Sequence, residues 1–117
     1  MRKIVKISGH EYSLKSSAWT QFKYKNDTGR GLLSDLMNLS KSSEEDIINN
    51  VDGMLDMLLR ITYNMIIEAN ENQVGSYEDF LKGLEESLFD DNQWMSDAIT
   101  TATSPLSRGI QKASPQE

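Results

Sequence analysis

The chain opens with two short segments in which apolar and polar residues alternate. These segments cover residues 4–7 and 12–14, and Ser8, Gly9 and His10 lie between them. Successive side chains of a strand point to opposite faces, so a period of two on either side of a glycine is typical of a β-hairpin. We therefore predict a small β-hairpin at the N-terminus.

Beyond residue 15 the apolar residues recur at the three- and four-residue spacing of helices. A first helix is expected to follow a serine cap at position 16 or 17 and to end at about residue 26, with Ala18, Trp19 and Phe22 facing inward. Glycines at positions 29 and 31 break this helix. A short second helix is expected to present one apolar face, made of Leu32, Leu33, Leu36, Met37 and Leu39.

The longest apolar pattern starts after residue 43. Ser42 and Glu45 stand three residues apart, which fits a capping box at the start of a long helix. Apolar residues then follow at steps of three and four from Ile47 to Ile66, and the segment 54–67 is apolar nearly all round. Such a helix is expected to be central or to be covered by a partner. Gly53 leaves open whether the helix bends there.

Two more helices complete the predicted fold. Ser76 and Asp79 offer a cap for a helix whose inner face contains Phe80 and Leu84, and residues 90–92 can cap a last helix that ends at residues 103–105. We predict a mainly α fold, in which the β-hairpin precedes a bundle of about four to five helices. One domain is expected over residues 1–103, followed by a flexible, disordered tail over residues 104–117.

The overall charge conceals a division along the chain. The 117 residues carry a net charge of −6, but residues 1–31 hold seven basic and two acidic residues (net +5), whereas residues 32–117 hold five basic and sixteen acidic residues (net −11). One interpretation is chance clustering on a solvated surface. The other is head-to-tail self-association between oppositely charged ends, into a ring or a spiral. The residues expected to take part are Lys3, Lys6, Lys23, Arg30, Asp90 and Asp91.

Composition excludes several function classes. The chain has no cysteine, which rules out disulfides and thiol catalysis, and no apolar run approaches the ~20 residues that span a bilayer, so no membrane partner is expected. His10 stands alone beside the predicted turn, and the acidic pairs are explained as helix caps and solvated faces. We therefore assign no catalytic, metal-binding or cofactor-binding residue, and we expect a protein that is not an enzyme.

The aromatic and methionine residues allow two interpretations each. Trp19, Phe22 and Tyr24 in the basic N-terminal third could stack on nucleic acid, but the overall acidity argues against that partner and favours a core position. Trp94 and Met95 follow an acidic loop. The sequence leaves two interpretations for them, an exposed contact with a partner or packing in the core. The residues predicted to bind a partner protein are Phe80, Leu84, Trp94 and Met95.

The order of these parts resembles the tail assembly chaperones of long-tailed phages, especially phages of Gram-positive bacteria. The resemblance covers residues 3–90. It is carried by the hairpin at residues 4–12, by Trp19 and Phe22, by Thr28 and Gly29 before the leucines of the second helix, and by the helix start at residues 76–81.

The resemblance implies a non-catalytic helper that coats the tape measure protein, keeps it soluble, and is displaced as tail tube protein polymerises. A tape measure protein exposes a long amphipathic helix, and unshielded apolar surface of that kind aggregates. The implied partners are therefore further copies of the chain, the tape measure protein and the tail tube protein. The implied location is the host cell cytoplasm during assembly, with absence from the mature virion, and a longer frameshifted form could branch off near residue 104.

Two other functions fit the same pattern. A small helical regulator would bind protein or nucleic acid through its basic N-terminal third, and its binding would be sensitive to salt. A structural connector or completion protein would instead remain in the finished virion.

Overall fold

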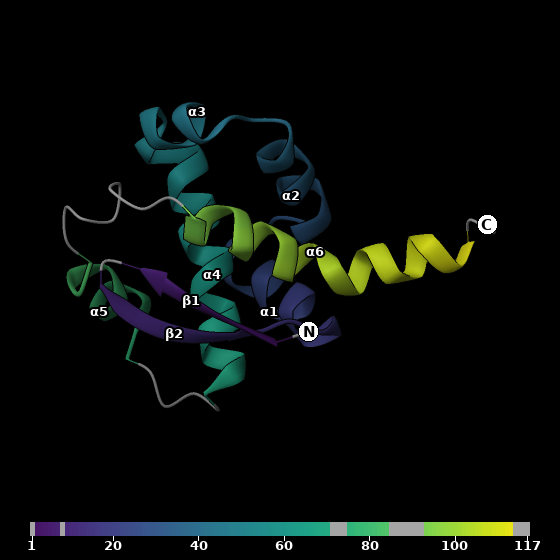
Figure 1. Cartoon of the computed structure of the whole chain (residues 1–117), viewed down its shortest axis with the longest axis horizontal. Coiled ribbons are helices and arrows are strands. Elements are labelled where there is room, and N and C mark those ends of the chain that lie inside the picture. The colour runs from purple at the N-terminus through teal and green to yellow at the C-terminus, as the bar shows by residue number, and fades with distance from the viewer. Residues whose placement is uncertain (1, 8, 71–74, 85–92, 114–117) are drawn as a thin grey trace.

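The computed structural model describes residues 2–7, 9–70, 75–84 and 93–113, and it confirms a mainly helical fold with an N-terminal β-hairpin (Figure 1). Its elements are β1 (Arg2–Ile7), β2 (His10–Lys15), α1 (Ala18–Thr28), α2 (Leu32–Ser40), α3 (Glu44–Asn49), the π-helix η1 (Val51–Leu55), α4 (Asp56–Ala69), α5 (Tyr77–Lys82) and α6 (Gln93–Ala113). Six α-helices thus lie in the described ranges, one more than the upper predicted number. None of these helices is both long and apolar enough to cross a bilayer.

The hairpin forms as its alternating pattern predicts. β1 and β2 pair antiparallel, from residue 2 opposite residue 15 to residue 7 opposite residue 10. Gly9 in the turn has a φ of 84°, a conformation that glycine adopts without the strain a side chain would bring. Val5, Ile7 and Leu14 point into the core, where β2 lies against α4 and β1 lies against α6.

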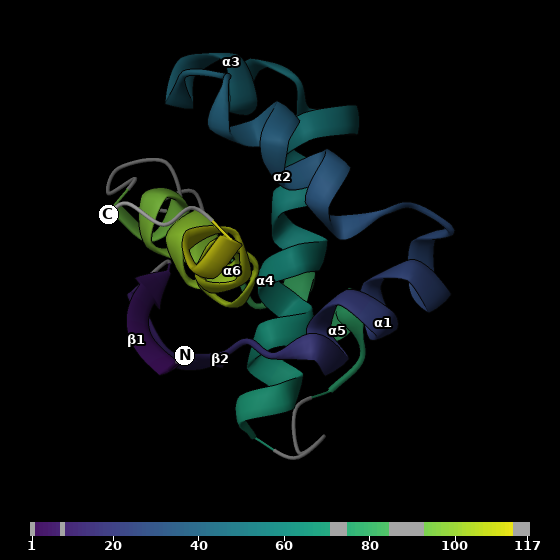
Figure 2. The ribbon, with the colours of Figure 1, turned by 90° about the vertical axis from the view of Figure 1, so that its right-hand side faces the viewer.

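α4 runs through the middle of the molecule. Figure 2 shows the hairpin and α6 on one side of it and α1 on the other. Every residue from 61 to 67 is buried, which confirms the central position that the apolar pattern predicted. The hydrophobic core around α4 includes Leu36, Leu39, Ile47, Leu55, Leu58, Ile61, Met65, Ile66 and Phe80.

The long helix predicted from residue 43 is divided. Its capping box is formed by Ser43 and Asp46 rather than by Ser42 and Glu45. The Ser42 hydroxyl instead donates to the carbonyl of Asn38, at the end of α2. α3 then ends at Asn49, and the φ of −112° and ψ of 69° at the next residue, Asn50, are not helical. The chain continues as the π-helix η1 through Gly53 before α4 begins, so the interruption lies at residue 50 and not at the glycine.

The predicted inner face of α1 is wrong. Ser17 caps the helix as expected, but the buried residues are Thr20 and Tyr24, four positions apart. Trp19 is 38% exposed and Phe22 is 65% exposed, and Ala18 is exposed as well. The helix is therefore turned so that Thr20 faces Glu68 on α4 and Tyr24 faces Asp35 on α2, because each side chain has its hydrogen-bond partner there.

The end predicted for the last helix also differs. α6 continues past Pro105 to Ala113, whereas the pattern predicted an end at residues 103–105 and a tail from residue 104. Proline has no N–H, so the carbonyl of Thr101 receives no helical hydrogen bond from residue 105. The Ser16 hydroxyl donates to that carbonyl instead, at 2.5 Å. In Figure 1 the second half of α6 extends away from the rest of the molecule.

Candidate functional site

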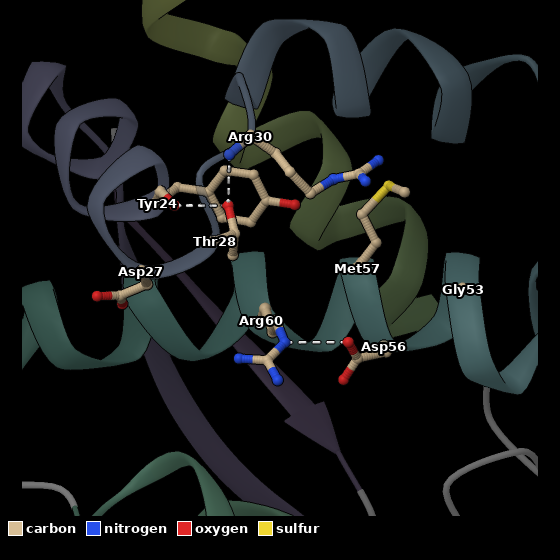
Figure 3. A pocket seen from close by; sticks show the side chains of 8 residues that line it. All are labelled: Tyr24, Asp27, Thr28, Arg30, Gly53, Asp56, Met57 and Arg60. Carbon is tan, nitrogen blue, oxygen red and sulfur yellow. Dashed lines mark hydrogen bonds and ion pairs between the residues drawn. The ribbon is translucent and has the colours of Figure 1, made fainter.

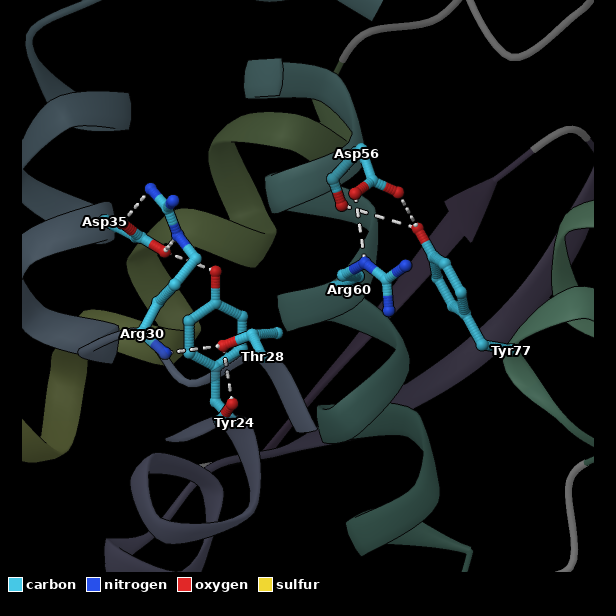
Figure 4. A network of polar contacts seen from close by, with 7 residues as sticks. All are labelled: Tyr24, Thr28, Arg30, Asp35, Asp56, Arg60 and Tyr77. Atoms are coloured by element: carbon cyan, nitrogen blue, oxygen red, sulfur yellow. Dashed lines mark hydrogen bonds and ion pairs between the residues drawn. The ribbon is translucent and has the colours of Figure 1, made fainter. Parts of the chain in front are cut away.

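A locked turn joins α1 to α2. Gly29 ends α1 with a φ of 75°, and its N–H donates to the carbonyl of Lys25 at 2.8 Å. The Thr28 hydroxyl donates to the carbonyl of Tyr24 at 2.7 Å and accepts from the backbone N–H of Arg30 at 3.1 Å (Figure 4). Because glycine tolerates the left-handed conformation, α1 can stop abruptly here and α2 can start within three residues.

The turn places Arg30 and Tyr24 on the carboxylate of Asp35. The guanidinium donates through Nε and Nη2 to both oxygens of Asp35, at 2.8 Å each, and the Tyr24 hydroxyl donates to Asp35 Oδ2 at 2.5 Å (Figure 4). Burial alone would raise the pKa of Asp35, but the hydrogen bonds from Arg30 and Tyr24 outweigh it, and the pKa lies below its usual value. Burial, then the contact with Asp35, raises the pKa of Tyr24. The network holds a charged carboxylate in the interior between α1 and α2.

A second carboxylate fixes the start of α1 against α4. The Ser17 hydroxyl donates to Glu68 Oε2 at 2.5 Å, and the Thr20 hydroxyl donates to Glu68 Oε1. The two hydroxyls also form the capping box of α1, in which the backbone N–H of Ser17 donates to Thr20 Oγ1 at 2.9 Å. Glu68 thus explains why the threonine face of α1, and not the Trp19 face, turns inward.

A third polar group lies between α4 and α5. Asp56 accepts from Arg60 Nε at 3.0 Å and from the Tyr77 hydroxyl at 2.8 Å (Figure 4). The Arg60 guanidinium carbon also lies 4.5 Å from the centre of the Tyr77 ring, a cation–π contact. Burial, followed by the hydrogen bond to Asp56, raises the pKa of Tyr77. This tyrosine therefore stays neutral and acts as a donor.

Two clefts lie between the C-terminal end of α1 and α4. The larger has a volume of about 360 Å³ and is lined by residues of α1, the turn, η1 and α4 (Figure 3). The second has a volume of about 260 Å³ and is lined by Asp27, Thr28, Arg60, Tyr63, Asn64 and Tyr77. Both are lined by Asp27, Thr28 and Arg60 and so lie next to each other, and we call the two together the α1–α4 groove.

Apolar side chains also remain exposed on the two helices beside the turn. Trp19 and Phe22 stand three residues apart on α1, and Leu33 (42% exposed) and Met37 (50% exposed) stand four residues apart on α2. Side chains three or four positions apart are neighbours on a helix surface. Each helix therefore carries a second apolar stripe in addition to its buried face, and we call these four residues the α1–α2 stripes.

The predicted partner-binding residues are mostly buried. Trp94 is 1% exposed, Met95 is fully buried and Phe80 belongs to the core, while Leu84 is partly buried against it. The expectation of an exposed contact at Trp94 and Met95 is therefore wrong. Both lie on α6 where it packs against α2 and α4, so their size contributes to the core and not to an open surface.

The residues predicted for self-association are not brought together as one surface. Lys3 and Lys6 are exposed on β1. Lys23 forms an ion pair with Asp27 on its own helix at 2.5 Å, and Arg30 is held by Asp35. Asp90 and Asp91 lie outside the described residues.

The buried polar networks were not predicted. Asp35 was counted only among the acidic residues of the chain, and its partner Tyr24 is eleven positions away. The one signal in the sequence is an aspartate inside an apolar helical pattern, four positions from Leu39 and next to Leu36. A charged residue at such a position needs a buried partner, and the nearest preceding cation is Arg30.

Within the described ranges, no group of three or more histidine, aspartate or glutamate side chains is arranged to hold a metal ion. Comparisons of the chain with protein family models, with curated proteins and with solved structures find no match. Among the described residues, the features available to a partner include the α1–α4 groove, the α1–α2 stripes and a cleft of about 580 Å³ lined by residues of α2, α3 and α6.

Proposed function

We propose that this chain is a non-enzymatic tail assembly chaperone of a long-tailed phage, which self-associates and coats the tape measure protein before the tail tube polymerises. The observation that carries this proposal is the set of apolar side chains that remain exposed on α1 and α2. Apolar anchors spaced three or four residues apart suit the capture of an amphipathic helix. An unassembled tape measure protein offers such a helix over a great length.

The charge of the same region favours an acidic partner helix. Residues 1–31, which include α1, carry a net charge of +5. Lys25 is exposed on the helix that carries Trp19 and Phe22. The occupant that we propose for the α1–α2 stripes is therefore an amphipathic helix with apolar anchors and acidic flanks. This surface replaces the one predicted on α5 and α6, whose large apolar residues are needed for the core.

The test is co-expression of the chain with the tape measure protein of the same phage. We expect the wild-type chain to keep that protein soluble and to elute with it in one peak. The double substitution Phe22→Ser and Met37→Ser removes two exposed anchors, each contributing on the order of 1–2 kcal/mol, so binding should weaken about 30- to 700-fold. Both residues are at least half exposed, and the fold should persist.

Leu81→Ser is the matched control. Leu81 is 36% exposed but lies on α5, outside both the α1–α2 stripes and β1, so its substitution should leave capture unchanged. Retention of capture by the double variant would overturn the assignment of the surface. A tape measure protein that stays insoluble beside the wild-type chain would overturn the function.

Self-association is the second part of the proposed function. Of the four basic residues considered for it, Lys3 and Lys6 are exposed on β1, whereas Lys23 and Arg30 pair with carboxylates of the same chain. We therefore place the positive end of the contact on β1. Light scattering of the purified chain should show a mass that rises with concentration and falls in about 1 M salt, because exposed charges are then screened beyond ~3 Å. A mass that is independent of salt would contradict this contact.

A further inference from the structure

The wall of the α1–α4 groove contains a buried polar atom without a partner. Asn64 is 2% exposed and lines the 260 Å³ part of the groove. Its side-chain oxygen, Oδ1, has no hydrogen-bond partner. Among the buried side-chain nitrogen and oxygen atoms of the described residues, it alone is unpaired. A buried acceptor left unpaired lowers stability, and leucine at this position would avoid that loss. The donor of a bound group can satisfy this acceptor in the wall of the groove.

Arg60, one helical turn before Asn64 on α4, is a donor-bearing side chain of the same cleft. Arg60 and Asn64 are four positions apart on α4, so their side chains are neighbours on one face of the helix. Arg60 donates to Asp56 through Nε, and within the described residues its terminal nitrogens make no further hydrogen bond. In Figure 3 its two terminal nitrogens point away from Asp56, on the side of Asp27. The side chain is 41% exposed, so it can shift to open the inner part of the groove.

The groove is neutral in the balance of its ion pairs. Arg30 is paired with Asp35, Arg60 with Asp56, and Asp27 with Lys23. A ligand with net charge thus finds no unpaired counter-charge among these residues. What remains is one buried acceptor beside the donors of Arg60, and its complement is a neutral group that carries a donor and an acceptor on the same edge.

We propose that the α1–α4 groove binds the primary carboxamide of a glutamine or asparagine side chain from a partner protein. The N–H of the carboxamide would donate to Asn64 Oδ1, and its oxygen would accept from the terminal nitrogens of Arg60. A backbone peptide group fits less well, because a trans peptide directs its N–H and C=O to opposite sides. The inference rests on the proposed role as a protein binder, but it concerns a different surface from the α1–α2 stripes.

The test is a titration of the full-length, ¹⁵N-labelled chain with propionamide, which mimics a glutamine side chain. We expect saturable shifts of the Asn64 side-chain amide and of Arg60 Nε–H, with a dissociation constant of about 1–100 mM for so small a ligand. Three further probes separate the alternatives: N-methylacetamide stands for a backbone peptide, propionate for an anion, and propylammonium for a cation. Each should shift the same signals at least about fivefold less.

Two variants keep the result interpretable. Asn64→Leu should abolish the propionamide shifts and leave the urea midpoint equal to or above that of the wild type. Arg60→Lys keeps the charge beside Asp56 but loses the planar pair of terminal donors, so it should also lose the shifts while remaining folded.

Equal shifts with all four probes, or none with propionamide, would overturn the proposal, as would an Asn64→Leu variant that unfolds at lower urea and still responds to propionamide. That last result would mean that Asn64 supports the fold. Because the titration uses the isolated chain, failure here is distinguishable from failure to capture the tape measure protein.

Discussion

The hydrogen bond from Ser16 to the carbonyl of Thr101 connects the end of the hairpin to α6 across 85 positions of sequence. Both residues are buried, Ser16 to 2% exposure and Thr101 completely. The carbonyl depends on this hydroxyl because Pro105 has no N–H to donate. Ser16→Ala should therefore leave a buried acceptor unpaired and lower the free energy of unfolding by about 1–3 kcal/mol.

The reasoning makes a sharper prediction in a second background. Pro105→Ala returns an N–H to residue 105, which can then donate to Thr101 within the helix. In that background Ser16→Ala should lower the free energy of unfolding by less than about 1 kcal/mol, because the carbonyl keeps a partner. The effects of the two substitutions on the free energy of unfolding are thus expected to be non-additive, because both act on the hydrogen bond to the Thr101 carbonyl.

The assay is urea unfolding of the four proteins of this cycle, followed by circular dichroism and by tryptophan fluorescence. Coincident transitions from the two probes would show that one cooperative unit unfolds. Equal losses from Ser16→Ala in the two backgrounds would refute the account of Pro105. A loss below about 0.5 kcal/mol in the wild-type background would refute the importance of the hydrogen bond itself.

Three other outcomes are expected. The pKa of Asp35 is lower in the folded chain than its ordinary value of 3.8, so its contribution to stability is present above about pH 4 and is lost as pH falls through the folded pKa; Asp35→Asn should remove that part of the acid dependence of the urea midpoint. Gly29→Ala should lower the free energy of unfolding by about 1–2 kcal/mol, because the φ of Gly29 is 75°. Gly31→Ala is the control: its φ is −81° and an added Cβ meets no atom at either glycine, so the loss should be less than about 0.5 kcal/mol in the same urea assay. Mass spectrometry of purified virions should detect tail tube protein but little or none of this chain, and stoichiometric amounts would instead favour a connector.

The elements that could be predicted from the sequence are those whose signal is local. The hairpin follows from alternation around Gly9, and the cap of α5 follows from Ser76 and Asp79 three positions apart. α4 follows from an apolar pattern that surrounds the helix nearly completely between residues 61 and 67. Each of these signals lies within a few residues, so no knowledge of the tertiary fold is needed to interpret them.

The orientation of α1 could not be predicted for the opposite reason. The aromatic residues of α1 were expected to face inward. Tyr24 does so, but Trp19 and Phe22 are exposed. The deciding contacts come from Glu68, 48 and 51 positions away, and from Asp35 on the next helix. Sequence spacing within the helix carries no information about such partners.

The candidate site shows the same limit. The acidic loop before Trp94 favoured an exposed contact, but the side chain is 1% exposed. Burial of so large an apolar side chain stabilises the core, and the charges that flank it in sequence do not reveal this. The α1–α4 groove unites Thr28, Arg60 and Tyr77, which come from three helices. Only the packing of those helices places them side by side.

The π-helix η1 sets the rotational phase between the two parts of the helical chain. The N–H of Leu55 donates to the carbonyl of Asn50 at 3.1 Å, five residues back where an α-helix would close over four. An α-helix turns about 100° per residue, so this one additional residue decides which way everything before it faces. Deletion of a single residue between 51 and 55 would give an ordinary α-helical turn, but it would rotate α3 by about a quarter turn and carry Ile47 away from the core. The wide turn is therefore needed for Ile47 to face the core in this fold.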